Sequence, residues 1–253
     1  MDGNSLGDRM KQYERWTATQ AQFPNQLPIA IRVDGKRFSR WTAKLEKPYC
    51  PNLMTLFQQT AFVVMRDMLD EAVLAYGQSD EVTFLLRPTA IGATGQFGNK
   101  RQKLETLTAS AFTAAFNNQC APGIQPALFD ARAILLPNPM EAHNLVLWRQ
   151  QDATRNSIQG AARAHFSHSK CMNLNCNQLQ DLLMTAGINW NDYPTAYKRG
   201  WTICRRAIQV SPQHLTDIAE EYRPTTPITR RRLIIDLDMP ILKDPTYITS
   251  LLT

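Results

Sequence analysis

The sequence predicts an α/β protein of the α+β kind, in which a ferredoxin-like sheet of pattern βαββαβ is followed by a helical C-terminal extension. Three observations predict this class. Between residues 29 and 136 the segments follow the order strand, helix, strand, strand, helix, strand, which is the split βαβ pattern. A short polar turn joins the two middle strands. Beyond residue 137, helix signals predominate over strand signals.

The chain opens with a predicted helix and a predicted strand. Residues 6–19 are polar and helix-compatible, with three large side chains at three-residue spacing to dock them. Ile29–Val33 is an apolar run of strand length, and it ends at the dipeptide Asp34–Gly35. Pro51 suits the first turn of a helix, and the apolar residues after it recur at helical spacing on one face.

A hairpin is predicted next. Two apolar runs of strand length within 72–86 flank a polar turn at 77–80, in which Gly77 supplies the conformational freedom that a turn needs. Asp80 and Glu81 lie where the second strand leaves this turn. Acids on a stiff, solvent-open backbone suit a metal ion, although ordinary surface carboxylates would give the same pattern.

The second half of the pattern is a loop, a helix and a strand. Residues 88–98 carry three glycines and are typical of a mobile loop, residues 100–118 have a helical apolar face, and residues 129–136 suit a strand. In a ferredoxin-like sheet the first strand and the hairpin pair near the centre. We therefore expect Asp34 and Asp80 to come close together.

Residues 138–253 are predicted to form a mainly helical extension with additional short strands, packed on residues 1–137 as one compact unit. The helix signals are a cap residue, a first-turn proline and an acid three positions after the cap. The expected elements are a helix from the Asn138 cap towards Asp152, a shorter helix at 177–186, and strands at 201–204 and 233–235.

Composition and charge narrow the function classes. Hydrophobic residues make up 43% of the 253 residues and charged residues 20%, which is typical of a globular protein and excludes a disordered one. The net charge of +6 and the pI near 9.2 favour a polyanionic partner such as a nucleic acid or a nucleotide.

The sequence also predicts the compartment. No apolar run approaches the length of a membrane span, and residues 1–5 lack the apolar core of a signal peptide. We therefore expect a soluble, cytoplasmic protein without a membrane partner. An odd, scattered set of cysteines in a chain of this size is expected to stay reduced. These cysteines are Cys50, Cys120, Cys171, Cys176 and Cys204.

The turn after the first strand is cationic. Gly35 allows close approach to the main chain, and the backbone amides of 36–38 are suited to an anion-binding nest, although Asp-Gly is also a common turn dipeptide. Two acids converging beside a cationic turn is the arrangement that two-metal phosphoryl or nucleotidyl transfer needs. Three lysines are candidates to neutralise a triphosphate, namely Lys36, Lys100 and Lys103.

Two blocks carry a family resemblance. Together, 31–38 (IRVDGKRF) and 75–81 (AYGQSDE) resemble the signature blocks of the tRNA-His guanylyltransferase superfamily of 3′–5′ nucleotide-adding enzymes. The likeness spans about residues 6–205, and it implies that residues 1–137 form a catalytic domain similar to a polymerase palm. Similar elements also lie at 47–48, 103–112, 129–132 and 197–200.

The resemblance implies roles for individual residues. Asp34 and Asp80 would bind two Mg²⁺ ions with help from the Gly35 carbonyl, and Glu81 would support this catalytic site. The residues implied to meet the nucleotide are Lys36, Arg37, Phe38, Lys47, Ser79, Lys100 and Lys103.

The resemblance also implies a reaction and an assembly. A 5′-monophosphorylated tRNA end would be activated with ATP or GTP, and the 3′-hydroxyl of an incoming nucleoside triphosphate would attack it. Related enzymes assemble as tetramers, which implies a homo-tetramer here.

The chain departs from the tRNA-His-specific members at one block. Those members carry a His-Ile-Asn-Asn type of block after a Trp-Arg-Gln helix end, whereas here 148–153 is followed by Thr154 in place of the histidine, and only Asn156 is kept. This version resembles the bacterial and archaeal branch, which favours template-dependent 5′-end repair. The alternatives are a guanylyltransferase that adds G at position −1 and a catalytically silent RNA-binding palm protein. Candidate contacts to RNA or a second nucleotide, which also suit an ordinary charged surface, are Arg155, Asn156, Arg163, Lys198 and Arg199.

Two further patterns carry less weight. His165, His168, Cys171 and Cys176 include zinc-ligand residue types, but their spacing matches no common finger, so we expect a helix end that faces solvent or RNA. The basic run 230–232 suits either a contact to RNA phosphates or, preferably, a solvated strand edge.

Overall fold

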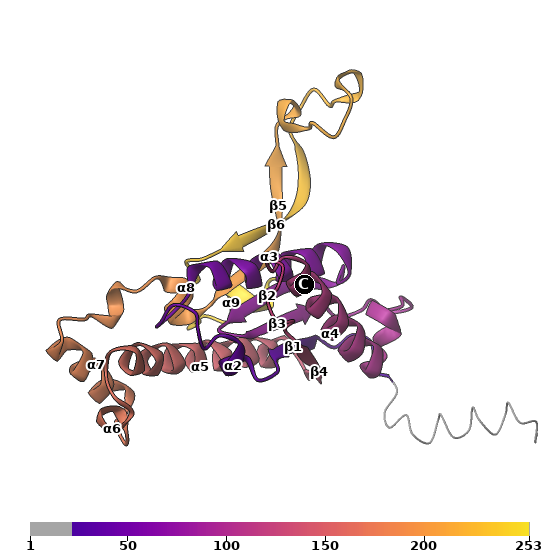
Figure 1. Cartoon of the computed structure of the whole chain (residues 1–253). Coiled ribbons are helices and arrows are strands. Elements are labelled where there is room, and N and C mark those ends of the chain that lie inside the picture. Colours follow the sequence, from indigo (N-terminus) through magenta and orange to yellow (C-terminus); the bar gives the residue numbers. More distant parts are fainter. Residues whose placement is uncertain (1–21, 253) are drawn as a thin grey trace, which may run out of the picture.

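A six-stranded antiparallel sheet organises the molecule, in the order β4-β1-β3-β2-β5-β6 (Figure 1). The computed structural model describes residues 22–252, so the helix predicted at 6–19 lies outside the described residues. The strands are β1 (Ile29–Gly35), β2 (Ala72–Gln78), β3 (Glu81–Leu86), β4 (Phe129–Leu135), β5 (Trp201–Val210) and β6 (Ile228–Asp236).

The first four strands confirm the predicted ferredoxin-like order. Helix α3 connects β1 to β2 and helix α4 connects β3 to β4, which gives the βαββαβ succession and the spatial order β4-β1-β3-β2. The helices are α2 (Phe38–Trp41), α3 (Pro51–Asp67), α4 (Arg101–Asn118), α5 (Pro139–His165), α6 (His168–Cys171), α7 (Cys176–Thr185), α8 (Thr195–Arg199) and α9 (Thr246–Thr249). The short 3₁₀ turns are η1 (Gln96–Asn99), η2 (Trp190–Asp192), η3 (Pro212–His214) and η4 (Glu220–Tyr222).

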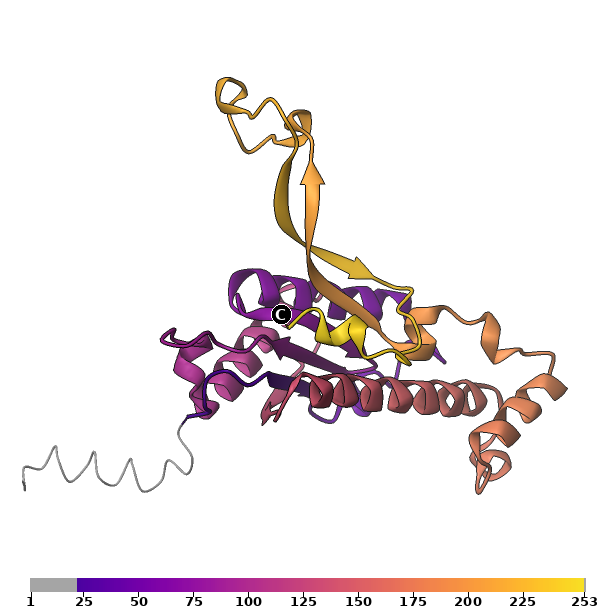
Figure 2. The same ribbon diagram turned by 180° about the vertical axis from the view of Figure 1, so that it is seen from behind.

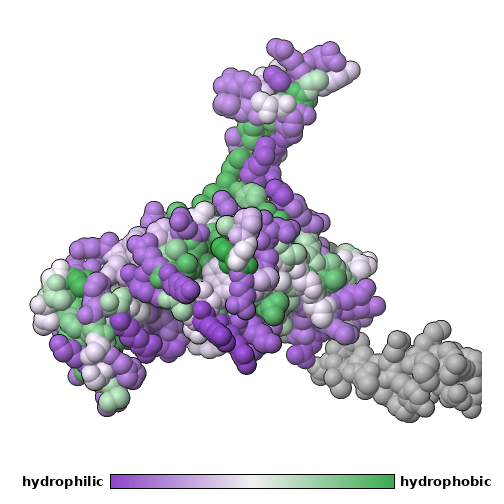
Figure 3. Space-filling view, viewed as in Figure 1, coloured by the Kyte–Doolittle hydropathy of each residue, from purple (hydrophilic) through white to green (hydrophobic). Residues whose placement is uncertain are grey.

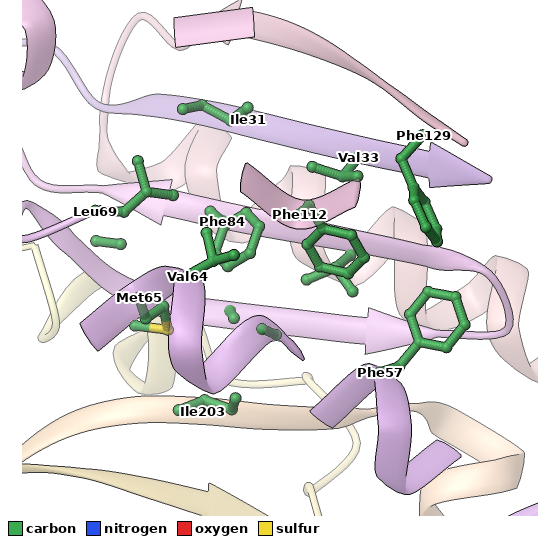
Figure 4. Close-up of a cluster of buried hydrophobic side chains, with 14 of the residues drawn as sticks. Ile31, Val33, Phe57, Val64, Met65, Leu69, Phe84, Phe112, Phe129 and Ile203 are labelled. Carbon is green, nitrogen blue, oxygen red and sulfur yellow. The ribbon is translucent and has the colours of Figure 1, made fainter. Parts of the chain in front are cut away.

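The main core lies between the sheet and helices α3 and α4 (Figure 4). Alternate residues of β1 point into it, because successive strand side chains point to opposite faces. Phenylalanine rings fill its centre; those of Phe112 and Phe129 have centroids 4.9 Å apart. Burying one such ring contributes about 1.5–3 kcal/mol. This core anchors the strand ends that carry the acidic residues.

Helices α5 and α9 pack on the opposite face of the sheet (Figure 2). Leu74, Tyr76 and Leu85 from the strands meet Val146 of α5 there, and Tyr76 is fully buried. None of the helices within residues 22–252 is both long and apolar enough to cross a bilayer.

The C-terminal half differs from the prediction in two ways. Helix α5 continues to His165, well past Asp152, because no proline or charge run interrupts the apolar stripe of α5. The two strands expected to be short are ten and nine residues long, and they form an arm that projects from the body (Figures 1 and 2). The arm is mostly exposed, with hydrophilic and hydrophobic residues along its length (Figure 3). The arginines of the arm interrupt the alternation of apolar and polar residues by which a strand is predicted, so the predicted strands were too short.

The role predicted for Gly77 is wrong. Gly77 lies inside β2, and the left-handed backbone conformation of the hairpin is taken by Ser79, with a φ of 49°. A Cβ atom on Gly77 would lie 2.1 Å from the indole of Trp201 on neighbouring β5. This glycine is therefore required by the close approach of a ring across the sheet.

Candidate active site

The structure brings the predicted acids together at one end of the central strands. Asp34 lies opposite Glu81 in the β1–β3 register, so these two side chains share the sheet face that carries α5. The backbone N–H of Gly35 donates a hydrogen bond to the Asp80 carbonyl oxygen over 3.1 Å. Asp34 and Asp80, which are 46 positions apart in the sequence, thus come to lie near each other, as predicted from the strand order.

Burial raises the pKa of both carboxyls, and neighbouring negative charge raises that of Asp34 further. Burial raises the pKa of Asp34 above its ordinary value, and the negative charges of Asp80 and Asp130 raise this pKa further, against opposing effects of Arg32 and Arg132. Burial also raises the pKa of Asp80, partly offset by the Ser79 hydroxyl, which donates to the Asp80 carboxylate over 3.0 Å. The ionised acids repel one another, and a bound cation would relieve this repulsion.

Glu81 belongs to a buried ion-pair network. Its Oε2 lies 3.3 Å from Nη1 of Arg149, and Nη2 of the same guanidinium lies 2.7 Å from Oδ2 of Asp152. The Arg149 side chain is only 7% exposed. Burial raises the pKa of Glu81, whereas Arg149 and then Arg32 lower it. Within the described residues, Oε1 of Glu81 is buried without a hydrogen-bond partner.

Sequence reasoning missed the Arg149–Asp152 part of this network. A signal was available: Arg149 falls on the same helical stripe as the buried residues Ala142, Val146 and Ala153 of α5. A charged residue on a buried stripe needs a buried partner of opposite charge, and Glu81 is that partner.

In the turn after β1, one of the three backbone amides of the predicted anion-binding nest already has a partner within the protein. The Lys36 amide donates to the Leu128 carbonyl over 2.8 Å, so it is not free to meet a phosphate. Arg37 adopts the left-handed conformation, with a φ of 53°, and turns the chain into α2. A Cβ atom on Gly35 would lie 2.5 Å from the ring of Phe38, so Gly35 is needed here for ring packing.

A pocket of about 380 Å³ is lined by Asp80, whereas Asp34 and Glu81 are not among its lining residues. It lies between the hairpin turn, the segment from α2 to α3, and the facing parts of α5 and α8. Tyr49 and Tyr197 stack in its wall with ring centroids 4.9 Å apart. The predicted residues that line it are Phe38, Lys47, Ser79, Asp80 and Asn156.

The structure does not bring Lys100 and Lys103 to this pocket. They lie at the start of α4, whereas Thr113, further along α4, accepts a hydrogen bond from the Phe129 amide. Phe129 is opposite Gly35 in the β1–β4 register, so the acids lie near the end of α4 and not near its start. The ten residues from Lys103 to Thr113 correspond to about 15 Å of helix.

The predicted RNA contacts lie on the elements that continue from the pocket. Arg155 of α5 is exposed and pairs with Asp152, which connects it to the Glu81 network. Arg163 lies two turns further along α5 and is exposed. On α8, Lys198 lies over the Trp190 ring at 5.6 Å from the centroid.

Arg199 is the other predicted contact on α8. The Arg199 carbonyl accepts a hydrogen bond of 2.7 Å from the buried Tyr76 hydroxyl, and its Nε is buried without a partner among the described residues. The residue therefore anchors α8 to the sheet.

The donor set at the acids fits magnesium. Carboxylate and carbonyl oxygens are the ligands that Mg²⁺ prefers, and Mg²⁺ is commonly bound through one or two carboxylates plus substrate phosphates. Asp34, Asp80 and the Gly35 carbonyl offer that set, and the mutual repulsion of the two carboxylates favours a cation. Within residues 22–252 there is no group of three or more His, Cys, Asp or Glu side chains placed to hold a metal, either at Asp34 and Asp80 or in the His165–Cys176 segment.

The sheet is ferredoxin-like, with paired carboxylates at the end of its central strands and a nucleotide-sized pocket next to them. These features define a protein of the polymerase-palm type. Comparison with known families makes the class specific. The model of the tRNAHis guanylyltransferase family matches residues 7–137. The chain belongs to this family, whose members are nucleotidyltransferases.

Relatives and solved structures agree with this assignment. The tRNA(His) guanylyltransferase of Schizosaccharomyces pombe is 31% identical over 212 residues, which covers 76% of this chain and 77% of that protein. A bacterial tRNA(His) guanylyltransferase-like protein in complex with ATP superposes with a TM-score of 0.82 at 33% identity, over 98% of this chain and 99% of that chain. Such a protein in complex with GTP gives a TM-score of 0.77 at the same identity and coverage.

Proposed function

We propose that this protein adds nucleotides in the 3′–5′ direction to the 5′ end of tRNA, copying the opposite strand to repair truncated ends. The observation that carries the proposal is the convergence of Asp34 with Asp80, which itself lines a pocket of nucleotide size. Membership of a nucleotidyltransferase family and the net charge of +6 support it.

The repair mode is supported by the α5 block and by the bacterial likeness. Thr154 stands where the tRNA-His-specific members carry histidine, and its hydroxyl is turned back to the Gln150 carbonyl over 3.0 Å. The bacterial guanylyltransferase-like structures cover nearly the whole chain, whereas the S. pombe enzyme covers about three quarters. Obligatory addition of one G at position −1 is the second candidate, because the similar curated relatives carry the name guanylyltransferase. A catalytically silent RNA-binding protein is a third candidate; that both carboxylates are present speaks for turnover.

Magnesium would be held by Asp34, Asp80 and the Gly35 carbonyl. When bound, it would neutralise the triphosphate and polarise the phosphorus that is attacked. The chain itself holds Asp34 at the end of strand β1 and Asp80 in the tight turn between β2 and β3, and Arg149 fixes the Glu81 carboxylate beside them. The half-buried setting limits the access of water to the reacting phosphate.

The pocket would take the nucleoside triphosphate. The bacterial relatives with ATP and with GTP support ATP or GTP as the compound that activates the 5′-monophosphate. Lys47 and Ser79 line the pocket and are suited to meet phosphate oxygens. The stacked Tyr49 and Tyr197 offer an aromatic wall for a base.

We place the protein in the cytoplasm as a homo-tetramer that acts on tRNA. The cytoplasmic location is supported by the five cysteines, all of which are free thiols. The tetramer rests on the family resemblance, and sedimentation of the purified protein tests it.

The test uses a 5′-truncated, 5′-monophosphorylated and labelled tRNA with each nucleoside triphosphate and Mg²⁺. We expect extension by the nucleotide complementary to the opposite strand, with several tRNA identities accepted. Addition of a single G, confined to tRNA-His, would instead support the guanylyltransferase candidate. No addition to any RNA, with binding retained, would support the silent protein.

A further inference from the structure

One part of the sheet face beside the acids is uncovered. Arg132 lies opposite Arg32, and Asp130 lies opposite Asp34, in the β1–β4 register, so these side chains share the face on which α5 packs. The Arg132 and Asp130 side chains are nevertheless 64% and 58% exposed. We call the surface formed by Arg32, Asp34, Asp130 and Arg132 the open sheet face.

Trp148 of α5 stacks on Arg149, and Arg149 shares the Glu81 carboxylate with Arg32 of the open sheet face. On the opposite side of the helix, Gln150 donates to the Pro240 carbonyl over 2.8 Å and accepts from the Leu242 amide over 2.9 Å. Helical positions are about 100° apart, so Trp148 lies about 160° around the helix from Gln150, on the side of α5 away from the contacts to Pro240 and Leu242. Its neighbour Arg149 contacts Glu81, which lies opposite Asp34.

The indole is both exposed and held in place. Trp148 is 52% exposed, whereas large aromatic side chains of a core are covered. One ring face carries the Arg149 guanidinium, whose Cζ lies 3.9 Å from the ring centroid, and Arg149 is itself fixed by two ion pairs. An indole with an immobilised inner face loses little conformational entropy when a flat ligand stacks on it.

On the proposed function, the ligand places a reacting phosphate at Asp34, and the exposed ring face of Trp148 is available for a flat group of the same ligand. The arginines of the open sheet face suit a phosphate backbone, and every base has a π-face that stacks on an aromatic ring. Resting on the proposed function, we propose that Trp148 is a stacking platform for the 5′-terminal base of the RNA. The indole thereby marks the end of the duplex and positions the terminal phosphate at the acids.

The test is a cycle between the protein and the RNA. The substrates are two short 5′-recessed RNA duplexes with a 5′-monophosphate, one with a normal 5′-terminal nucleotide and one with an abasic 5′-terminal nucleotide. The proteins are the wild type, Trp148→Ala, Trp148→Phe and the matched control Tyr222→Ala. Tyr222 is 76% exposed on η4, remote from the acids along the chain. Both KM for RNA and the equilibrium Kd are measured.

In the wild type we expect the abasic RNA to bind about tenfold more weakly, within the range for base–aromatic stacking. Trp148→Ala should weaken binding of the normal RNA about tenfold and remove most of the difference between the two RNAs. Trp148→Phe should retain most of the difference, and Tyr222→Ala should match the wild type. KM for the nucleoside triphosphate should stay unchanged in all four proteins.

An undiminished abasic effect in Trp148→Ala would overturn the inference, because the indole would not then touch the base. A change of oligomeric state on Trp148→Ala, seen by sedimentation, would also overturn it and assign the indole to a subunit contact. If the wild type added no nucleotide to any RNA, the proposed function would fail, while the Kd cycle would still decide the role of Trp148.

Discussion

Asp34 and Asp80 are side chains that lower the stability of the fold and at the same time prepare a site for a cation. Each carboxyl is half-buried with a raised pKa, and among the described residues no lysine or arginine forms an ion pair with either of them. Groups arranged in this way are costly for the apo fold and favourable once a cation is present.

Asp34→Asn should therefore stabilise the protein in the absence of Mg²⁺. Because the pKa of Asp34 is raised in the folded state, ionisation of this carboxyl destabilises the fold. The destabilisation begins as the pH rises through the pKa of the unfolded state and is complete above the pKa of the folded state. At pH 7 we expect a gain in the free energy of unfolding on the order of 1 kcal/mol, measured by urea denaturation. The gain should vanish near pH 3, and added Mg²⁺ should stabilise only the wild type. A loss of stability at pH 7 without metal would contradict this account.

Arg149 is the residue that the Glu81 network depends on. Arg149→Met should cost about 3 kcal/mol in the free energy of unfolding, because it leaves the buried Glu81 carboxylate with only the Arg32 guanidinium, at 3.8 Å, as a cationic partner. Arg149→Lys should recover part of this loss. In the double variant Arg149→Met with Glu81→Gln, the loss in the free energy of unfolding should be smaller than the sum of the two single losses. Strictly additive losses in denaturant unfolding would show that the pair is not coupled.

Among the elements, the β2–β3 hairpin was the most predictable from sequence. Its two apolar runs and the acids between them set both the strand bounds and the neighbourhood of Asp34 and Asp80. What the sequence could not supply was the partner on the far side of β2. Trp201 is more than 120 positions away, so the reason for Gly77 becomes visible only once β5 is placed.

Gly77→Ala tests that contact. The new Cβ would overlap the Trp201 indole, which is 2% exposed and has little room to shift. We expect a loss of about 1–3 kcal/mol in the free energy of unfolding, in the range for overpacking. Neither Gly92→Ala nor Gly95→Ala is a suitable control. Gly92 has a φ of 78°, which strains any other residue, and a Cβ atom on Gly95 would overlap the side chains of Asn99 and Thr89. Trp201→Phe in the Gly77→Ala background should restore part of the stability, and no restoration would place the strain elsewhere.

Helix α5 shows the limit of local signals. The Asn138 cap and Pro139 predicted where the helix begins, and the Asn138 side chain does accept the Glu141 amide. The helix was predicted to run towards Asp152, and it continues beyond that residue because the buried stripe goes on with Ser157, Ile158 and Ala161. That longer helix is what carries Asn156 to the pocket wall.

At the scale of the whole molecule, the sequence predicted the ferredoxin-like half and underestimated the rest. β5 pairs with β2, so the strands of the extension, which were predicted to be short, join the palm sheet as two long additional strands. The arm escaped prediction because its strands are exposed on both sides and lack the alternation that burial imposes.

The projecting arm should be dispensable for folding. Residues Ala207 and Arg231 are paired in the β5–β6 register, so residues 208–230 can be replaced by an Asn-Gly turn. We expect the midpoint of thermal unfolding to change by less than about 4 °C, because the removed segment lies outside the two main cores. Loss of the cooperative transition would show that the arm supports the sheet.

The most direct test of the central claim is the single-turnover rate of nucleotide addition to a truncated, 5′-activated tRNA at saturating Mg²⁺. It is measured for the wild type, Asp34→Asn, Asp80→Asn and the double variant. If the two carboxylates act as one unit, each single variant should lose at least about a thousandfold in rate, and the double variant should be hardly slower than either. A near-normal rate in either single variant would contradict the account.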